Sequence, residues 1–295
     1  MKEKYDNTNQ IDISANISDN VILGKHNVIG KNVVIQGFKE KGGIIQIGDC
    51  NIINDNTRIV IGSGGLLIGD WNIFHNNMLV MGEKRMEIGH NCWFGQNTIL
   101  DSTGGLIIEN GIRVGMYSQI WTHVASGELI EGCTLFGERE TLIQDDVWLV
   151  GSCIVSSGVT LGKRGVYLIG SNITKNTEPY RVYAGNPAKI MDKLSFYKEM
   201  ELDEKLRMMH NWVVEFTLIN PEYSYEKLEK QIIIKTNLSD EKLIILANNL
   251  TSDTNIGISY FSLSSKTYIK TLSELERNFY KFIYNNKARF IPTTL

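Results

Sequence analysis

The sequence predicts a mainly β fold in which short strands wind into a solenoid, followed by a smaller α+β region. Three observations carry this prediction: large apolar residues recur every six positions, glycine almost disappears after residue 185, and an apolar stripe at helical spacing follows. A period of six fits neither an amphipathic helix, whose period is 3.6, nor one long strand, whose period is 2. It fits a chain that turns a corner after every short strand.

The six-residue repeat is clearest between Ile47 and Val166. Its apolar positions form five groups: Ile47, Ile53 and Ile59; Ile68, Phe74 and Val80; Ile88, Phe94 and Leu100; Ile108, Val114 and Ile120; and Ile143, Leu149, Val155 and Leu161. The first four groups begin at residues 47, 68, 88 and 108, so one coil takes 20 or 21 residues in three steps. The same spacing from Ile11 to Ile35 predicts the first coils. The repeat therefore predicts triangular coils that stack on one another.

The residues that exceed three steps of six always follow the third apolar position of a coil, so they should stack along one corner. After Ile120 this corner opens into a long excursion, Trp121 to Leu142, which contains His123. Functional residues concentrate in loops that a rigid scaffold positions. We therefore expect the chemistry of the protein in this excursion.

Glycine marks the end of the solenoid. Of the 27 glycines, 26 lie at or before Gly185 and only Gly257 follows. Tight turns need residues that tolerate positive φ, and glycine does so best. We therefore assign residues 1–190 to the solenoid domain and residues 191–295 to a C-terminal helix with a small α+β domain.

The C-terminal region alternates between helical and strand patterns. Residues 191–219 are predicted as a helix because five apolar residues are spaced by 4, 3, 4 and 3: Leu202, Leu206, Met209, Val213 and Phe216. Apolar runs predict strands at 231–235, 243–247 and 256–263, a second helix at 272–284 and a last short strand at 288–291. No motif in this region points to a function.

Composition limits the classes of partner. The net charge of −3 gives no reason to expect nucleic acid or an acidic membrane surface. The four cysteines are far apart and form no CxxC pair, which argues against a zinc knuckle or a disulfide framework and suits a reducing cytoplasm. The first residues contain no apolar signal-peptide core, and no apolar run is long enough to span a membrane. We expect a cytoplasmic protein.

Four stretches near the end of the solenoid resemble a known family. They are Trp148-Leu149-Val150-Gly151, Ser157-Gly158-Val159-Thr160-Leu161-Gly162, Gly170-Ser171-Asn172-Ile173-Thr174-Lys175 and Tyr183-Ala184-Gly185-Asn186-Pro187-Ala188-Lys189. The pattern resembles the closing coils of the hexapeptide-repeat acyltransferases, most of all the acetyl-CoA-dependent O-acetyltransferases of sugars and surface polysaccharides. The resemblance covers about residues 11–190. It implies a left-handed parallel β-helix, acetyl-CoA as co-substrate, and a homotrimer whose active sites are shared between subunits.

One stretch departs from the family pattern. The chain has one residue fewer than the family between Gly165 and the pair Gly170-Ser171, and it lacks the small alanine expected there. In the family this neighbourhood lines the channel for the pantetheine arm of coenzyme A. The departure therefore falls in a coil that the resemblance places against coenzyme A.

His123 is the candidate catalytic base. It lies in Ile120-Trp121-Thr122-His123, where the resemblance places the catalytic histidine of the family. A sugar hydroxyl is a poor nucleophile at neutral pH. A neutral imidazole can take its proton as the hydroxyl attacks the thioester carbonyl, and can pass that proton to the departing thiolate. The alternative is a solvated loop histidine.

Asp101 is the candidate that orients this histidine. It occupies the position in its coil that Trp121 occupies in the next, so about 4.8 Å of stacking separates their strands. A backbone carbonyl or one of four loop carboxylates could serve instead: Glu128, Glu131, Glu138 or Glu140. A solvated corner carboxylate is the other interpretation of Asp101.

Aromatic and histidine side chains are candidates for binding the substrates. The resemblance places Trp148 near the acyl donor, although a partly buried corner aromatic would look the same. Trp121, Trp93 and Tyr117 could form an aromatic wall for a sugar. His75 and His90 could line the acceptor cleft, but structural or surface roles are favoured for both.

Coenzyme A binding is expected in the last coils. The resemblance points to Gly151 and to Ser157-Gly158 along the pantetheine arm. Four basic residues lie where the 3′-phospho-ADP end binds in the family: Lys163, Arg164, Lys175 and Lys189. Phosphates attract such cations, although any one of the four can be a solvated charge.

Together these features predict an acetyl-CoA-dependent O-acetyltransferase acting on a saccharide of a surface glycan, for example a capsule or lipooligosaccharide sugar such as sialic acid. Direct transfer is expected, because no Ser or Cys nucleophile is paired with His123 in the sequence. The alternatives are an N-acetyltransferase on an amino sugar nucleotide and a non-catalytic β-helix. A metal centre of His75, His90 and His123 is disfavoured because their spacing does not repeat the coil, so no metal is expected.

Overall fold

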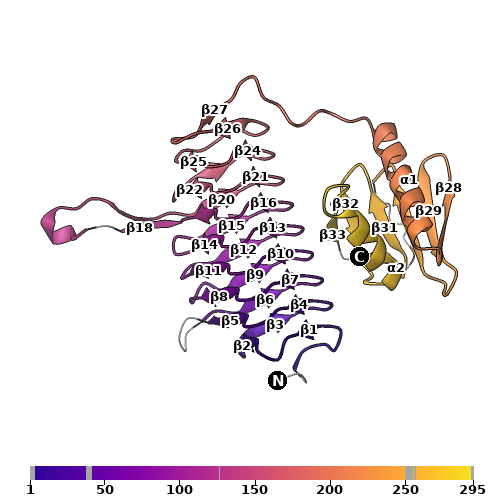
Figure 1. Cartoon of the computed structure of the whole chain (residues 1–295), viewed down its shortest axis with the longest axis horizontal. Coiled ribbons are helices and arrows are strands. Elements are labelled where there is room, and N and C mark those ends of the chain that lie inside the picture. Colours follow the sequence, from indigo (N-terminus) through magenta and orange to yellow (C-terminus); the bar gives the residue numbers. More distant parts are fainter. Residues whose placement is uncertain (1–3, 38–41, 126, 250–254, 256, 294–295) are drawn as a thin grey trace. The chain divides into compact units, whose positions relative to one another are not determined.

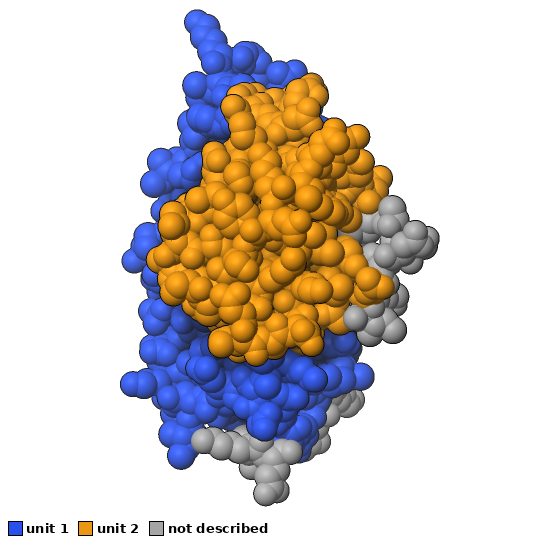
Figure 2. All heavy atoms as spheres, turned by 90° about the vertical axis from the view of Figure 1, so that its right-hand side faces the viewer, with its two compact units in different colours: residues 1–197 blue, residues 198–295 orange. Residues whose placement is uncertain are grey.

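The computed structural model describes residues 4–37, 42–125, 127–249, 255 and 257–293. The chain divides into two compact units, Met1–Tyr197 and Lys198–Leu295, which Figure 2 distinguishes by colour. The boundary between the units thus lies seven residues beyond the position 190 that glycine usage suggested.

Unit 1 is a β-helix with three parallel sheets, which we call its first, second and third faces (Figure 1). The first face contains β1 (Gln10–Ile11), β4 (Val28–Ile29), β7 (Ile52–Ile53), β10 (Ile73–Phe74), β13 (Trp93–Phe94), β16 (Arg113–Val114), β21 (Trp148–Leu149), β24 (Val166–Tyr167) and β26 (Val182–Ala184), with β27 (Lys189–Ile190) added antiparallel at its end. The second face contains β2 (Asn16–Ile17), β5 (Val34–Gly37), β8 (Arg58–Ile61), β11 (Leu79–Gly82), β14 (Ile99–Asp101), β17 (Gln119–Ile120), β22 (Ile154–Val155) and β25 (Asn172–Ile173). The third face contains β3 (Val21–Leu23), β6 (Ile45–Ile47), β9 (Leu66–Ile68), β12 (Met86–Ile88), β15 (Leu106–Ile108), β20 (Thr141–Ile143) and β23 (Thr160–Leu161).

Successive strands visit the three faces in turn, and each strand pairs in register with the strand one coil away. On the first face, Ile53 pairs with Phe74 and Phe74 pairs with Phe94, so these three side chains stack inside the coil. The Phe74 and Phe94 rings stack with centroids 4.9 Å apart. All sixteen apolar positions of the repeat from Ile47 to Leu161 are buried. The predicted fold, a parallel β-helix followed by a helix and a small α+β region, is confirmed.

The corners are held by ladders of polar side chains between successive coils. Asn27 Oδ1 accepts a hydrogen bond from the backbone N–H of Asn51, Asn51 Oδ1 accepts one from Asn72, and each is 2.8 Å long. The ladder ends where Asn72 Oδ1 accepts the N–H of Cys92, also at 2.8 Å. Side chains therefore accept hydrogen bonds from the buried backbone N–H groups at these turns, which water cannot reach.

The corner between the first and second faces requires glycine at position 115. A Cβ atom at Gly115 would lie 2.0 Å from the carbonyl oxygen of Val150 and 2.7 Å from the Cα atom of Gly151 on the next coil. Both neighbours are backbone, so neither can move without separating the coils. Gly115→Ala is expected to lower the free energy of unfolding by about 1–3 kcal/mol, measured by urea denaturation.

Gly137→Ala is the matched control for this substitution. A Cβ atom there would come no closer than 3.6 Å to any neighbour, the Nε atom of Arg139. Its effect should stay within about 0.5 kcal/mol of zero. Equal stability of Gly115→Ala and the wild type would show that the coils are not held at this spacing.

Unit 2 combines a six-stranded mixed sheet with two helices. Its elements are α1 (Leu202–Ile219), β28 (Tyr223–Lys227), β29 (Gln231–Thr236), β30 (Lys242–Leu246), β31 (Ser259–Ser262), β32 (Thr267–Ile269), α2 (Glu274–Ile283) and β33 (Ile291–Thr293). The buried residues of α1 are Leu206, Met209, Val213 and Phe216, which are four of the five stripe positions. None of the helices in the described residues is both long and apolar enough to cross a membrane.

The structure corrects several boundaries in this region. Helix α1 begins at Leu202 rather than at 191, because the apolar stripe begins there and Leu194, Phe196 and Tyr197 upstream are exposed. A helical turn without packing gains too little to form. The predicted strand at 256–263 is β31, which begins at Ser259; its first residue, 256, lies outside the described residues. Strands β28 and β32 were not predicted, because four residues of β28 are exposed and β32 has only three residues.

Candidate active site

The long excursion after β17 is a β-hairpin that leaves the corner between the second and third faces. Strand β18 (His123–Ala125) pairs antiparallel with β19 (Phe136–Glu138), and the chain rejoins the third face at β20. We call residues 121–140 the corner hairpin. Figure 1 shows that it projects away from the stacked coils. Strand β18 begins at His123, so the candidate base lies where the projecting arm meets the rigid β-helix.

His123 and Asp101 are brought into direct contact. Asp101 is the last residue of β14, one coil below, and its carboxylate Oδ2 lies 2.8 Å from Nδ1 of His123. The Asp101 side chain is fully buried, whereas the His123 side chain is 32% exposed. The carboxylate is therefore fixed in the corner, and the imidazole extends from it toward solvent.

Four further hydrogen bonds hold the Asp101 carboxylate. Its Oδ1 accepts from the N–H of Thr103 at 3.1 Å and from the Thr103 hydroxyl at 2.6 Å. Its Oδ2 accepts from the N–H and the hydroxyl of Thr122, both at 2.9 Å. Burial acts to raise the pKa of Asp101, but the hydrogen bonds from Thr103, His123 and Thr122 together outweigh it and lower the pKa. Asp101 is therefore held as an anion.

The anionic Asp101 determines the tautomer of His123. An ionised carboxylate can only accept hydrogen bonds, so Nδ1 of His123 must carry the proton in this contact. In the neutral imidazole the lone pair then lies on Nε2, the nitrogen on the other side of the ring. Among the alternative carboxylates, Glu138 instead pairs with Lys84 at 3.1 Å. The arrangement leaves one basic nitrogen, with a fixed direction, available to a ligand.

The lowered pKa of Asp101 predicts acid sensitivity. A carboxyl whose folded-state pKa is depressed stabilises the fold fully above its unfolded pKa, about 3.9, and this stabilisation is lost as pH falls through the folded pKa. Urea unfolding midpoints of the wild type should therefore fall between about pH 5 and pH 2. The fall should be smaller in Asp101→Asn, which cannot titrate there. An identical pH dependence in the two proteins would contradict the assignment.

A pocket of about 410 Å³ lies between the corner hairpin and the second face. Its walls are Trp121, His123, Val124, Thr134, Leu135, Phe136, Arg139, Ile154, Ser156 and Ser157. The Trp121 ring stands edge-on to the His123 ring, with centroids 5.9 Å apart and planes at 76°. The pocket thus joins the candidate base to aromatic and apolar walls, as a small-molecule site requires.

Ser157 and Gly158 lie at the same corner, one coil above His123. The Ser157 hydroxyl donates to the Thr122 carbonyl at 3.0 Å, and the Gly158 N–H donates to the Thr141 hydroxyl at 3.1 Å. Ser157 lines the pocket, and Gly158 has a φ of +79°. Both residues, which the resemblance assigned to the pantetheine arm, therefore adjoin the candidate base within one chain.

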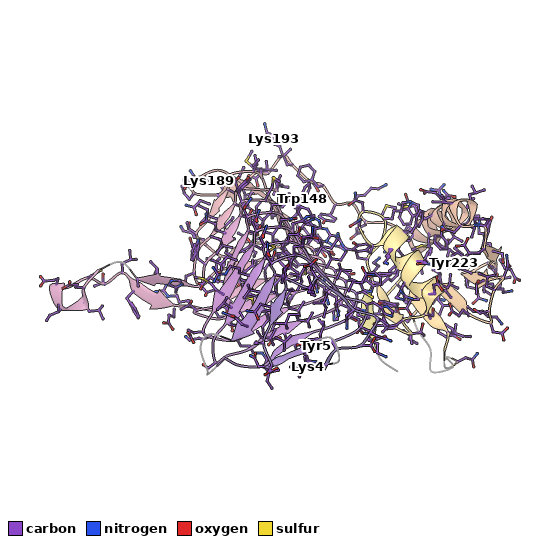
Figure 3. All side chains as sticks on the ribbon, turned by 60° about the horizontal axis from the view of Figure 1, so that its bottom comes forward. Lys4, Tyr5, Trp148, Lys189, Lys193 and Tyr223 are labelled. Atoms are coloured by element: carbon purple, nitrogen blue, oxygen red, sulfur yellow. The ribbon has the colours of Figure 1, made fainter. Side chains whose placement is uncertain are left out.

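Other predicted site residues lie elsewhere on the β-helix. Trp148, Trp93 and His75 lie on the first face or directly after one of its strands, and none of them lines the pocket. In Figure 3 Trp148 lies on the side of the β-helix away from the corner hairpin. Tyr117 and Gly151 lie at the corner between the first and second faces. A single chain does not bring these five residues to His123.

His75 and His90, the other two candidate histidines, both make structural contacts. The His75 ring packs edge-on against the Trp93 ring, with centroids 4.8 Å apart, and burial lowers the pKa of His75. His90 is one rung of a corner ladder: its Nδ1 accepts the N–H of Asp70 at 2.8 Å, and its own N–H donates to Asn110 at 2.9 Å. Within one chain, neither His75 nor His90 lines the pocket that contains His123.

The basic residues of the last coils differ in their partners. Lys163 pairs with Asp145 at 3.1 Å, and Arg164 pairs with Asp146 at 3.4 Å. Arg164 also lies over the rings of Tyr180 and Tyr197, at 5.6 and 5.3 Å from their centroids. Lys175 and Lys189 are exposed, the latter in β27, where Figure 3 labels it. The side chains of Lys163 and Arg164 remain 44% and 38% exposed, so a phosphate could still approach all four residues.

Within the described part of the chain, no group of three or more His, Cys, Asp or Glu side chains could hold a metal ion. The sequence analysis missed several residues that shape the site. Thr103 and Thr122 fix Asp101, and Phe136 and Arg139 line the pocket. No spacing rule marks these residues, because their positions depend on the hairpin and on contacts between coils.

Comparison with known proteins gives curated acetyltransferases as relatives, among them proteins of Lysinibacillus sphaericus and Agrobacterium fabrum. The "Probable macrolide acetyltransferase" of Lysinibacillus sphaericus is 34% identical over 73 residues, which is 25% of this chain and 40% of that protein. The chloramphenicol acetyltransferase of Agrobacterium fabrum is 39% identical over 54 residues, or 18% of this chain and 26% of that protein. The chain thus spans less than half the length of these relatives. No protein-family model matches the chain.

Solved structures also resemble the chain. The polysialic acid O-acetyltransferase OatWY aligns with 65% of this chain and 92% of its own, at 20% identity and a TM-score of 0.43. The two curated relatives are both acetyltransferases. The predicted resemblance of this chain to acyltransferases is therefore confirmed.

Proposed function

We propose that this protein is an acetyl-CoA-dependent O-acetyltransferase that acts on a saccharide. The observation that carries the proposal is the 2.8 Å contact between His123 Nδ1 and the buried, ionised Asp101. It produces an oriented base at the wall of a pocket of ligand size. The similarity to curated acetyltransferases supports the proposal that the transferred group is acetyl.

In the proposed reaction, Nε2 of His123 accepts the proton of a sugar hydroxyl as its oxygen bonds to the thioester carbonyl carbon. The carbon–sulfur bond then breaks, and the imidazolium returns the proton to the thiolate of coenzyme A. Asp101 stabilises the transient imidazolium without taking its proton. A base of this kind contributes about 10²–10⁴-fold to the rate.

Direct transfer between the two substrates fits the site better than an acyl-enzyme. In the described residues, no Ser or Cys side chain is hydrogen-bonded to His123, and Ser157 donates its hydroxyl proton to the Thr122 carbonyl instead. Cys133 is the cysteine of the corner hairpin and does not line the pocket. A nucleophile activated by the imidazole is therefore missing from these contacts.

We propose that the donor site is shared between subunits of a homotrimer. Ser157 and Gly158 adjoin His123, whereas Trp148, Gly151 and the four basic residues lie on other coils and corners. A neighbouring subunit can supply this second group to the first. The basic residues fit the 3′-phospho-ADP end of the donor, because all four side chains remain accessible.

The finer identity of the acceptor comes from the sequence motifs. They favour a sugar of a surface glycan, such as capsule or lipooligosaccharide, with sialic acid as one candidate. We place the reaction in the cytoplasm, which suits the four free cysteines.

The test is a thiol-release assay with purified protein, acetyl-CoA and a panel of acidic and neutral saccharides. We expect release of free coenzyme A that depends on one class of saccharide. Release that requires a UDP-linked amino sugar, with an amide product, would favour N-acetyl transfer. Absence of both release and acetyl-CoA binding would support the non-catalytic β-helix.

A further inference from the structure

Arg139 is the cation of the pocket. It lies in the corner hairpin directly after β19, and its backbone N–H donates to the Thr122 carbonyl at 2.9 Å. Its aliphatic stem packs against Gly158, where an added Cβ would lie only 2.8 Å from the Cβ of Arg139. Its guanidinium lies over Gly137, 3.6 to 4.0 Å from where a Cβ would be. The side chain is therefore positioned along its whole length.

The pocket contains no acidic residue to neutralise this guanidinium. The ten lining residues include Arg139 and His123 but neither Asp nor Glu. Asp101 is buried behind His123, and its oxygens already accept five hydrogen bonds. Among the described residues no carboxylate is paired with Arg139, whereas Lys84 and Arg85, near the same corner, are paired with Glu138 and Glu87. The protein as a whole carries a charge of −3, so this positive pocket is a local feature.

We propose that Arg139 binds a carboxylate of the acceptor, so that the enzyme selects acidic saccharides. This inference rests on the proposed acetyltransferase function. The planar guanidinium offers two parallel N–H groups, which match a carboxylate in a bidentate pair. Trp121 and Phe136 on the same walls suit the apolar face of a sugar ring. The four basic residues suited to the donor phosphates, Lys163, Arg164, Lys175 and Lys189, lie on other coils. We therefore assign Arg139 to the acceptor.

The test compares two ligands that differ only in the carboxylate. Methyl glycosides of glucuronic acid and of sialic acid are matched with their neutral carboxyl methyl esters, and dissociation constants are measured by nuclear magnetic resonance titration. The wild type should bind each acid about 10- to 100-fold more tightly than its ester, as expected for a charge-assisted pair. Arg139→Gln should lose this preference and bind the esters as the wild type does. Arg139→Lys should keep part of it.

Three controls distinguish the charge of Arg139 from loss of any surface cation, from unfolding and from altered binding of the donor. Arg85→Gln removes an exposed cation that pairs with Glu87 outside the pocket, and should keep the preference for acids. Thermal unfolding checks that Arg139→Gln is folded, since glutamine retains the stem that packs against Gly158. For acetyl-CoA, and separately for dephospho-CoA, the dissociation constant of Arg139→Gln should equal that of the wild type.

Three results would overturn the inference. The first is equal binding of acid and ester by the wild type, and the second is a preference for acids that survives in Arg139→Gln. The third is an Arg139→Gln variant that loses affinity for acetyl-CoA alone, which would assign Arg139 to a donor phosphate. Because binding needs no turnover, a failure of this inference can be distinguished from a failure of the proposed function. Thiol release that is equally efficient with neutral and acidic saccharides would leave the transferase intact and reject the role of Arg139. Carboxylate-dependent binding without any thiol release would reject the transferase and leave an acidic-saccharide site.

Discussion

His123→Ala is expected to lower kcat by about 10²- to 10⁴-fold, the contribution of a positioned general base. The substitution removes Nε2, the acceptor of the hydroxyl proton, but it removes little packing, since a third of the side chain is exposed. Asp101 would still accept four hydrogen bonds from Thr103 and Thr122, so the corner should stay folded. Steady-state kinetics should therefore show a loss in kcat with the KM for acetyl-CoA almost unchanged.

Two further variants make this result specific. His123→Asn retains an amide that can donate to Asp101 but offers no base, so it should be as inactive as His123→Ala. His210→Gln replaces a histidine of α1 in unit 2, which contacts Tyr225 with ring centroids 5.5 Å apart, and should keep full activity. Wild-type kcat in His123→Ala would show that another group accepts the proton.

Asp101→Asn is expected to lower kcat by about 10²-fold through the tautomer of His123. The Asn side chain can turn its NH2 group toward Nδ1, and the proton of the imidazole then moves to Nε2. The nitrogen that faces the hydroxyl would carry a proton and could not accept another. The KM for acetyl-CoA should change little, because Asp101 is buried and does not line the pocket.

Asp70→Asn serves as the matched control, because Asp70 is a carboxylate in a corner ladder of an earlier coil. Its Oδ1 accepts the N–H of Asp49 at 2.9 Å, and the amide oxygen of asparagine can do the same. Activity should therefore be unchanged in this variant. If Asp101→Asn loses stability but keeps the wild-type kcat, Asp101 supports only the fold of the corner.

The β-helix was largely predictable because its core repeats. Each coil buries the same three positions against the coils above and below, so a period of six is enough to identify residues such as Phe74 and Leu149 as core. The same stacking argument placed Asp101 below Trp121 and within reach of His123, and the structure brings Asp101 and His123 together. Predictions that depend on register between coils succeed because parallel pairing fixes that register.

Residues outside the repeat were harder to place. Arg139 lies in the pocket only because β18 and β19 pair and return it to the Thr122 carbonyl, a contact that no periodicity reveals. His90 looked like a possible ligand contact because the sequence does not show that its Nδ1 accepts the backbone N–H of Asp70. Trp148 and Gly151 matched the family pattern, but sequence position alone does not say which corner a residue faces.

The central claim is that His123 catalyses acetyl transfer from acetyl-CoA to a saccharide hydroxyl. The most direct measurement uses acetyl-CoA with an isotopically labelled acetyl group and follows the label in the saccharide product of the wild type and of His123→Ala. Our account predicts a labelled acetyl ester on the saccharide with the wild type and almost none with the variant over the same time. Equal labelling by both proteins, or label that never reaches a saccharide oxygen, would contradict it.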